Sequence, residues 1–282
     1  MTRTAEYYDN AVYGADVLLR GTGVIGLILG DQLHPPMVAD PDIWANSSRW
    51  KEGAEECVRR LARRAGIEQG DRVVDVGCGV GGATRLLRRE FGARAFGLNI
   101  SEEQLRTAHR LGNEDPYIKG DAHCIPLASG SVDSVLSFNM FYHIAHKRAA
   151  LSEMARVTRP GGMLAFDDWV LTDQATESDR LQLLAHWNPE PVAWTTDVNL
   201  LDDMRAAGYE ILCIDDYTHV GRTVMRDWFG PTFEREVRPA IVAADALHGE
   251  AVADHLRAAI DHTIELYVQR KLRYVQIVAR KS

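Results

Sequence analysis

A glycine-rich loop between an apolar strand and a helical segment constrains the fold more than any other feature of this sequence. Residues 72–76 form a short apolar run that predicts a strand, and residues 83–91 have the pattern of a helix. Between them the chain reads Val-Gly-Cys-Gly-Val-Gly-Gly, ending at Gly82. Glycine allows a sharp backbone turn and leaves room for a ligand to approach closely. The sequence therefore predicts a strand–loop–helix unit whose loop binds a ligand.

Strand-like and helical segments continue to alternate along the chain. A helix is expected to begin at Ser101, with Gln104 at the spacing of a capping box, and another spans 147–158 before Pro-Gly-Gly. Further strands are expected at 94–100, 131–138, 163–167, 209–215 and 273–279. This alternation predicts an α/β fold with a parallel sheet that helices cover on both faces.

Two regions interrupt the alternation with helical and aromatic material. A segment as long as 217–270 within a compact sheet must have structure of its own. Open α/β sheets bind ligands at the carboxyl ends of their strands. We therefore expect an N-terminal helical cap at 1–65, a core formed by 66–216 and 271–282, and a helical cap insertion at 217–270 over the substrate pocket.

The composition narrows the class of protein and its partners. The 282 residues carry a net charge of −8, which argues against nucleic acid as a partner. The four cysteines form no C-x-x-C pair, and no His/Cys/Asp/Glu cluster has metal-ligand spacing, so neither a disulfide framework nor a metal is expected. The N-terminus lacks the pattern of a signal peptide, and the apolar stretch 23–30 is shorter than the about 20 residues of a membrane span. A cytoplasmic protein is expected, and its oligomeric state is left open.

The glycines also satisfy G-x-G-x-x-G, the pattern of dinucleotide-binding proteins, through Gly77, Gly79 and Gly82. Two residues argue against an NAD-dependent oxidoreductase. Asp75 lies two positions before the first glycine, where a carboxylate repels a pyrophosphate but suits a cationic ligand. Asn99 occupies the position, about 20 residues further on, where an acid would bind the NAD ribose.

Three motifs together resemble class I S-adenosylmethionine-dependent methyltransferases. The segment 73–82 resembles the first motif of that family, Gly-Asp-Ala at 120–122 resembles the loop that holds the adenine, and Arg-Pro-Gly-Gly-Met-Leu at 159–164 resembles the turn before the fifth strand. The resemblance implies a Rossmann-like, doubly wound, seven-stranded sheet with helical cap insertions. It also implies S-adenosylmethionine as the cofactor and methyl transfer as the activity. The intact motifs disfavour a module that binds the cofactor without catalysis.

The segment after the second strand narrows the resemblance. Gly-Leu-Asn-Ile-Ser at 97–101, followed by Gln104, is similar to the branch of cyclopropane fatty acid synthases, sterol C-methyltransferases and sarcosine/dimethylglycine N-methyltransferases. That branch implies that Asn99 and Gln104 share the contact to the ribose. Tyr-Tyr-Asp at 7–9 and the segment 30–34 resemble its cofactor cap. Tyr8 there either makes a cation–π contact with the sulfonium or pins the cap to the core.

The expected site residues follow from these motifs. Asp121 matches the position that contacts the exocyclic amine of adenine, and His123 is expected to form a wall of the adenine pocket. His143 follows the strand 131–138 near the expected methyl group and is the candidate general base. The alternative for His143 is a histidine that bonds to backbone or contacts the cofactor. The cofactor is expected to contact Tyr8, Asp75, Gly77, Cys78, Gly79, Asn99, Ile100, Gln104, Asp121, Ala122, His123 and Asn139.

The acceptor is expected to bind between the cap segments and the core. Aromatic residues gather in these segments: Trp44, Trp50, Trp169, Trp187, Trp194, Trp228 and Phe229. An enclosed pocket with apolar walls suits a small organic acceptor. The first hypothesis is O- or N-methylation of a small molecule, as in natural-product biosynthesis. The second is C-methylation of a prenyl, terpenoid or other electron-rich carbon, and an NAD-dependent oxidoreductase is the alternative from another class.

Overall fold

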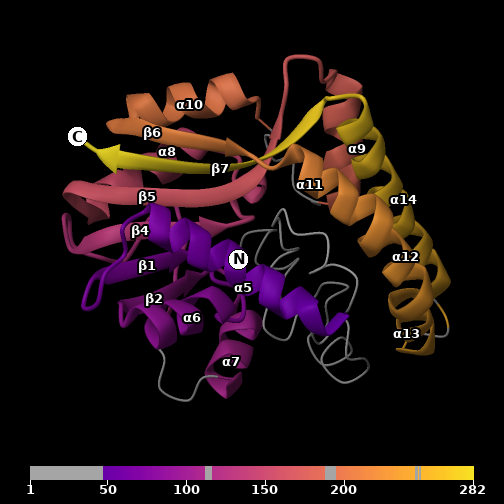
Figure 1. Ribbon diagram of the computed structural model, residues 1–282, viewed down its shortest axis with the longest axis horizontal. Coiled ribbons are helices and arrows are strands. Elements are labelled where there is room, and N and C mark those ends of the chain that lie inside the picture. Colours follow the sequence, from indigo (N-terminus) through magenta and orange to yellow (C-terminus); the bar gives the residue numbers. More distant parts are fainter. Residues whose placement is uncertain (1–46, 112–115, 188–194, 245–246, 248) are drawn as a thin grey trace.

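The structure is a computed structural model, which describes residues 47–111, 116–187, 195–244, 247 and 249–282. A seven-stranded sheet lies at its centre in the order β3-β2-β1-β4-β5-β7-β6 (Figure 1). The doubly wound, seven-stranded α/β fold expected from the sequence is confirmed. The strands are β1 (Arg72–Val76), β2 (Arg94–Asn99), β3 (Tyr117–Lys119), β4 (Val132–Phe138), β5 (Thr158–Leu171), β6 (Tyr209–Asp216) and β7 (Leu272–Lys281).

The expectation of a wholly parallel sheet is wrong at the last strand. β7 pairs antiparallel with both β5 and β6, whereas the neighbours among β1 to β5 are parallel. The connection explains this, because β6 ends at the carboxyl edge and the helices that follow stay there (Figure 1). The chain therefore enters β7 from that edge and runs back through the sheet. β3 has no counterpart among the expected strands, since three residues are too few to show a period of two.

Helices pack on both faces of the sheet, and the strands alternate between two apolar cores. Val73 of β1 belongs to one core and Val74 to the other, as the pleat of a strand requires. The first core also contains apolar side chains of α5 (Ser47–Arg64) and α6 (Gly82–Phe91). The second contains those of α8 (Lys147–Val157) and α10 (Asp197–Ala206). α7 (Glu102–Leu111) packs against β2 and β3.

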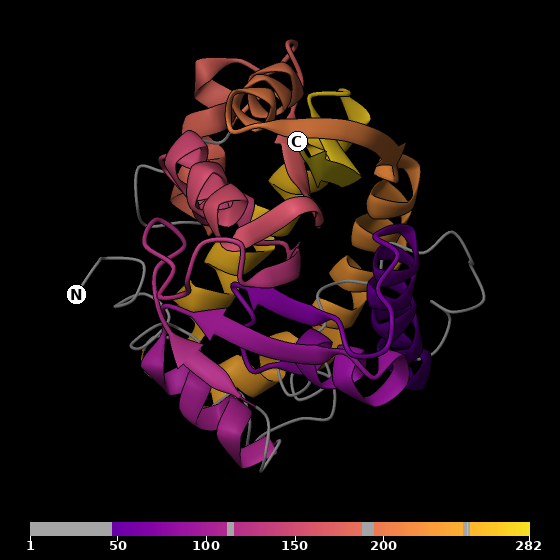
Figure 2. The same cartoon turned by 90° about the vertical axis from the view of Figure 1, so that its left-hand side faces the viewer.

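Another group of helices lies beyond the carboxyl edge, on the right in Figure 1 and behind the sheet in Figure 2. Two π-helical turns, Val224–Phe229 and Phe233–Val237, interrupt this group. β5 and β7 reach toward it as a ribbon, because they stay paired as far as Leu171 and Leu272, beyond the end of β4. The helices of this group are α9 (Glu177–Trp187), α11 (Thr218–Thr223), α12 (Gly230–Thr232), α13 (Arg238–Ala244) and α14 (Gly249–Val268). The helices after β6 thus occupy the expected cap insertion at 217–270, whereas α9 belongs to the segment expected to be core. That the insertion covers the acceptor stays a prediction.

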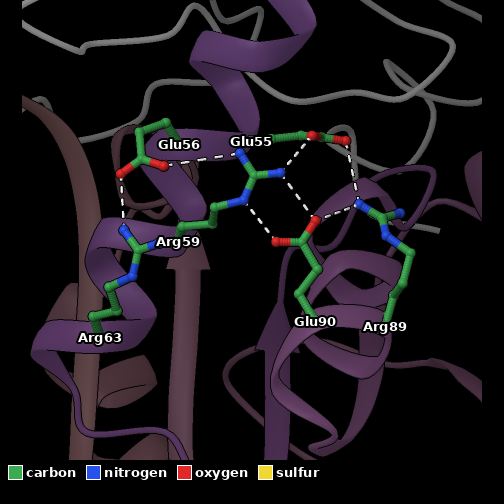
Figure 3. A network of polar contacts seen from close by, with 6 residues as sticks. All are labelled: Glu55, Glu56, Arg59, Arg63, Arg89 and Glu90. Atoms are coloured by element: carbon green, nitrogen blue, oxygen red, sulfur yellow. Dashed lines mark hydrogen bonds and ion pairs between the residues drawn. The ribbon is translucent and has the colours of Figure 1, made fainter.

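A network of ion pairs fastens α5 to α6 on the surface (Figure 3). Arg59 of α5 contacts Glu90 of α6 at 2.6 Å and Glu55 on its own helix at 2.7 Å. Arg89 of α6 contacts the same two carboxylates. The Arg59 guanidinium, through its hydrogen bonds, lowers the pKa of Glu90 to about 2. Arg59 is therefore the central cation of the link between the two helices.

Arg59→Ala is expected to lower the free energy of unfolding by about 0.5–1 kcal/mol at low salt, the range for partly exposed ion pairs. Because the pKa of Glu90 is depressed, this contribution is present above the unfolded value of about 4.3 and is lost as the pH falls toward 2. Urea titrations at several pH values measure it. Arg63→Ala is the matched control, since Arg63 pairs with Glu56 within α5. Equal losses in the two variants would contradict the assignment.

Candidate active site

The loop after β1 has a backbone that only glycine adopts without strain. Gly77, Gly79 and Gly81 have φ of 78°, 56° and 82°, in the left-handed region. The N–H groups of Gly77 and Cys78 donate to the carbonyl of Leu98 at 2.8 and 3.1 Å, which ties the loop to β2. A Cβ added to Gly77 would lie 2.4 Å from the Cγ of Met140. The loop thus lies close to the end of β4 and presents backbone rather than side chains.

Asp75 is turned into the protein, toward the first turn of α6. Its side chain is buried and accepts a hydrogen bond from the Thr84 hydroxyl at 2.7 Å. Burial raises the pKa of Asp75 to about 7, and the Thr84 hydrogen bonds act in the opposite direction. Cys78 is also buried, which raises the pKa of its thiol well above the usual range. Thr84 is a site residue that sequence reasoning missed, because the contact depends on how α6 packs on β1.

Asp75→Asn is expected to flatten the decline of stability between about pH 4 and pH 7. An unfolded aspartate titrates near 3.9, so between these values the folded protein holds a proton that the unfolded chain has released, and the wild type loses stability as the pH rises. The free energy of unfolding of the variant, relative to wild type, should therefore increase from pH 4 to pH 7 in urea titrations. Asp173→Asn, at an exposed carboxylate, is the control. A difference that stays constant with pH would contradict the raised pKa of Asp75.

The side chains of Asn99 and Gln104 meet beside the glycine loop. Asn99 Nδ2 donates to Gln104 Oε1 at 2.7 Å and to the Gly79 carbonyl at 3.4 Å. The Ser101 hydroxyl accepts from the backbone N–H of Gln104 at 3.2 Å, so it caps α7 as expected. The Gln104 half of the expected capping box is directed to Asn99 instead. The structure thus brings two of the expected residues to the loop, and Ile100 follows Asn99 directly in the chain.

Asp121 and His123 form a pair just after β3. Asp121 Oδ1 accepts from both the backbone N–H and the Nδ1 of His123, at 2.8 and 2.7 Å. The hydrogen bond to His123 lowers the pKa of Asp121, and the same bond raises that of His123. Both side chains are partly exposed, and Ala122 between them packs against the core. The contacts with His123 occupy Oδ1 of Asp121, and Oδ2 can accept from a ligand.

The turn after β4 places Asn139 and His143 differently. Asn139 has φ of 49°, and its Nδ2 donates to Asp167 at 3.1 Å and to the Tyr274 hydroxyl at 2.8 Å. Its amide is therefore directed into the core, and a contact to the cofactor would fall to its backbone. His143 ends a 3-10 turn, Phe141–His143. Its ring is half-buried, and the ring centroids of His143 and Tyr142 are 3.9 Å apart.

Two adjacent carboxylates of β5, Asp167 and Asp168, hold this turn and are missing from the expected site. Asp167 accepts from the Cys57 thiol at 3.1 Å and from Asn139. Burial raises its pKa to about 6. The only sequence signal is a pair of acidic residues within an apolar run, Phe-Asp-Asp-Trp-Val, which a half-buried strand does not need.

Three of the expected residues, Tyr8, Trp44 and Trp194, lie outside the residues that the structure describes. Within residues 47–111, 116–187, 195–244, 247 and 249–282, no group of three or more His, Cys, Asp or Glu residues is arranged to hold a metal ion. No helix in that part of the chain is long and apolar enough to cross a bilayer.

The convergence of a glycine loop, an amide pair and an acid at the carboxyl edge of a doubly wound sheet defines a protein class that binds a nucleoside-bearing cofactor. Residues 74–166 match the methyltransferase domain family. This part of the chain belongs to that family. The match confirms the expected resemblance to class I S-adenosylmethionine-dependent methyltransferases.

Three comparisons extend the family match. The chain is 32% identical over 175 residues to a sterol 24-C-methyltransferase of Eremothecium gossypii, covering 55% of this chain and 44% of that protein. It is 30% identical over 183 residues to an O-methyltransferase of Penicillium expansum, covering 61% and 65%. The chain thus spans less than two thirds of either relative. A Galdieria sulphuraria structure, assigned as a sarcosine dimethylglycine methyltransferase, shares the fold with a TM-score of 0.81 at 19% identity, covering 98% of both chains.

Proposed function

We propose that this chain is an S-adenosylmethionine-dependent methyltransferase that acts on a small-molecule acceptor. The observation that carries the proposal is the meeting of the glycine loop, the Asn99–Gln104 pair and Asp121 at the edge of a matched methyltransferase domain. A sheet does not need such a group of polar residues for its stability. Buried or constrained polar groups at the carboxyl edge of a sheet are typical of ligand sites.

Three parts of this edge, namely the glycine loop, the Asn99–Gln104 pair and Asp121, fit different parts of the cofactor. The left-handed backbone at Gly77 and Gly79 would hold its amino-acid end, and Asn99 with Gln104 would share the ribose hydroxyls. The second oxygen of Asp121 would accept from the adenine amine, while His123 keeps the carboxylate ionised and oriented. S-adenosylmethionine supplies a methyl group bonded to a sulfonium, which is already activated for displacement.

The chain's own part in the reaction is to orient the acceptor, exclude water and remove a proton. Alignment of two reactants accounts for much of the acceleration in such displacements. His143 ends the 3-10 turn after β4, and Met140 at the start of that turn lies close to Gly77 of the glycine loop. It would accept the proton of a hydroxyl or ammonium acceptor during O- or N-methylation. We place this reaction in natural-product biosynthesis in the cytoplasm, where the four free cysteines would stay reduced.

A C-methyltransferase is the second candidate, and an aromatic cluster favours it. Tyr142 and Trp169 are buried with their ring centroids 5.3 Å apart, next to His143. Aromatic faces stabilise cations, and methylation of an alkene passes through a carbocation. The sterol relative is named as a C-methyltransferase and the Penicillium relative as an O-methyltransferase. Residues 74–166 match a methyltransferase domain, and position 99 holds an asparagine rather than the acid that would bind the NAD ribose. The alternative of an NAD-dependent oxidoreductase is therefore without support.

Calorimetry with S-adenosylhomocysteine and with NAD⁺ tests the cofactor. Binding of the homocysteine product with a micromolar dissociation constant, and no heat from NAD⁺, is the expected result. Binding of NAD⁺ alone would overturn the proposal. A panel of phenols, amines and prenyl diphosphates, incubated with S-adenosylmethionine and analysed by mass spectrometry, then distinguishes the acceptors. Products methylated only on carbon would reject the O- or N-methylation hypothesis in favour of the second candidate.

A further inference from the structure

Two neighbouring residues of β5, Asp167 and Asp168, are buried carboxylates next to the turn that carries His143. Their exposed fractions are 2% and 0%. Asp167 lies level with Phe138, the last residue of β4. Because they are consecutive on a strand, their side chains leave opposite faces of the sheet. A buried carboxylate is costly unless hydrogen bonds and an opposite charge compensate it, so two in succession require specific partners.

Both carboxylates find those partners in the turn after β4. Asp168 Oδ2 accepts from the backbone N–H groups of Phe141 and Tyr142, and its Oδ1 accepts from the N–H of Trp169 at 2.7 Å. Asp167 Oδ1 accepts from the N–H and the amide of Asn139, each at 3.1 Å. The turn is therefore held at its start by Asp167 and at its centre by Asp168.

Lys147 compensates Asp168 and holds the end of the same segment. It is the first residue of α8, is only 5% exposed, and donates from Nζ to the Ile144 carbonyl at 2.8 Å. Its charge favours the ionised form of Asp168. The side chain of His143 thus projects from a segment that is tied to the protein on both sides of it.

We propose that Asp168 is a positioning residue, which sets the place of the His143 imidazole by binding the backbone N–H groups of Phe141 and Tyr142. Lys147 is its counter-charge. The inference deepens the proposed function, because it rests on the placement of His143 at the reacting end of the site. All the hydrogen bonds to Asp168 come from N–H donors, so the hold requires a carboxylate that accepts at both oxygens. Protonation would convert one oxygen into a donor and weaken it.

The groups around Asp168 set how readily it is protonated. Burial raises its pKa, and the charge of Asp167 acts in the same direction. Lys147 and the N–H donors act against it. The hydroxyls of Tyr267 on α14 and Tyr274 on β7 also lie within electrostatic range, and both stay neutral because burial raises their pKa values. Asp203 of α10 acts on Lys147 and supports its charge. Loss of the Lys147 charge should therefore favour protonation of Asp168.

Asp168→Asn tests the hold without any acceptor. An asparagine offers one oxygen, so either the pair at Phe141 and Tyr142 or the N–H of Trp169 loses its partner. Hydrogen exchange should show protection factors reduced by about 10-fold or more, roughly the loss of one hydrogen bond, at Phe141 and Tyr142 or at Trp169, on whichever side faces the amide nitrogen. The ring signal of His143, assigned in ¹³C-histidine spectra by its absence in His143→Gln, should shift. Asp167→Asn is the matched control and should change exchange at Asn139 instead.

Lys147→Met gives a readout that a packing role would not change. Methionine keeps an unbranched chain and removes the charge, so the pH below which Phe141 and Tyr142 lose protection should rise by one unit or more. This variant also decides the matter if Asp168→Asn does not fold. Unaltered protection and an unaltered His143 signal in folded Asp168→Asn, or a loss in Lys147→Met that is equal at every pH, would overturn the proposal. Failure of the wild type to bind S-adenosylhomocysteine would overturn the proposed function while leaving these measurements intact.

Discussion

Gly79→Val is expected to raise the dissociation constant for S-adenosylhomocysteine by more than about 100-fold, a loss of about 2.7 kcal/mol. Gly79 has φ of 56°, between the buried Cys78 and the start of α6, and its carbonyl lies next to the Asn99 amide. A branched side chain at this point both strains the left-handed backbone and occupies the space through which the cofactor is proposed to approach the loop. Calorimetry measures the affinity.

The matched control separates the loss of the site from the loss of the fold. Gly66 has φ of 65°, lies after α5, and has no atoms within 4 Å of an added Cβ. Gly66→Val should therefore carry a similar backbone strain, of about 1–2 kcal/mol or more for a β-branched residue, with S-adenosylhomocysteine affinity within about twofold of wild type. Thermal unfolding of both variants checks the strain. Wild-type affinity in a folded Gly79→Val protein would remove the glycine loop from the cofactor site.

The elements that could be predicted are those whose signals are local. β1, α6, β4 and α8 begin and end within a residue or two of the expected positions, because apolar runs there are bounded by glycine, proline or polar residues. The direction of β7 depends on which edge of the sheet the preceding helices occupy. The residues of β7 themselves do not indicate that edge, so the antiparallel direction could not be predicted. The expected number of strands came from the family resemblance rather than from periodicity.

The contacts of the site also divide into those that local motifs predict and those that depend on packing. The proximity of Asn99, Gln104 and the glycine loop follows from motifs at the ends of β1 and β2, since neighbouring parallel strands end at one edge. The partners of Asp75 and Asn139 could not be predicted, because Thr84 and Tyr274 reach them only through packing. Asp168 is the clearest case. Its Oδ2 accepts hydrogen bonds from backbone N–H groups more than 25 residues away in the chain. Every residue type except proline has a backbone N–H, so the sequence does not indicate such a contact.

His143→Ala is expected to lower turnover with a hydroxyl acceptor by about 10²–10⁴-fold, the usual contribution of a positioned base. Its position supports the assignment: the 3-10 turn that ends at His143 begins next to Met140, which contacts the glycine loop, and is held by Asp168. The affinity for S-adenosylhomocysteine should stay within about threefold of wild type, because the base acts on the acceptor. Radiolabelled methyl transfer measures turnover, and calorimetry measures the affinity.

The pH profile and a second substitution distinguish a base from a wall of the pocket. A base must lose its proton before it can accept one, so the wild-type rate should rise with pH and then level off, and the His143→Ala rate should lack that rise. His143→Gln keeps a polar side chain of similar reach without the proton transfer, and should be nearly as slow as alanine. An alkene acceptor requires no early deprotonation, so it would leave both variants fast with flat profiles. In that event the packed rings of Tyr142 and Trp169, rather than His143, would be the groups that stabilise the reacting centre.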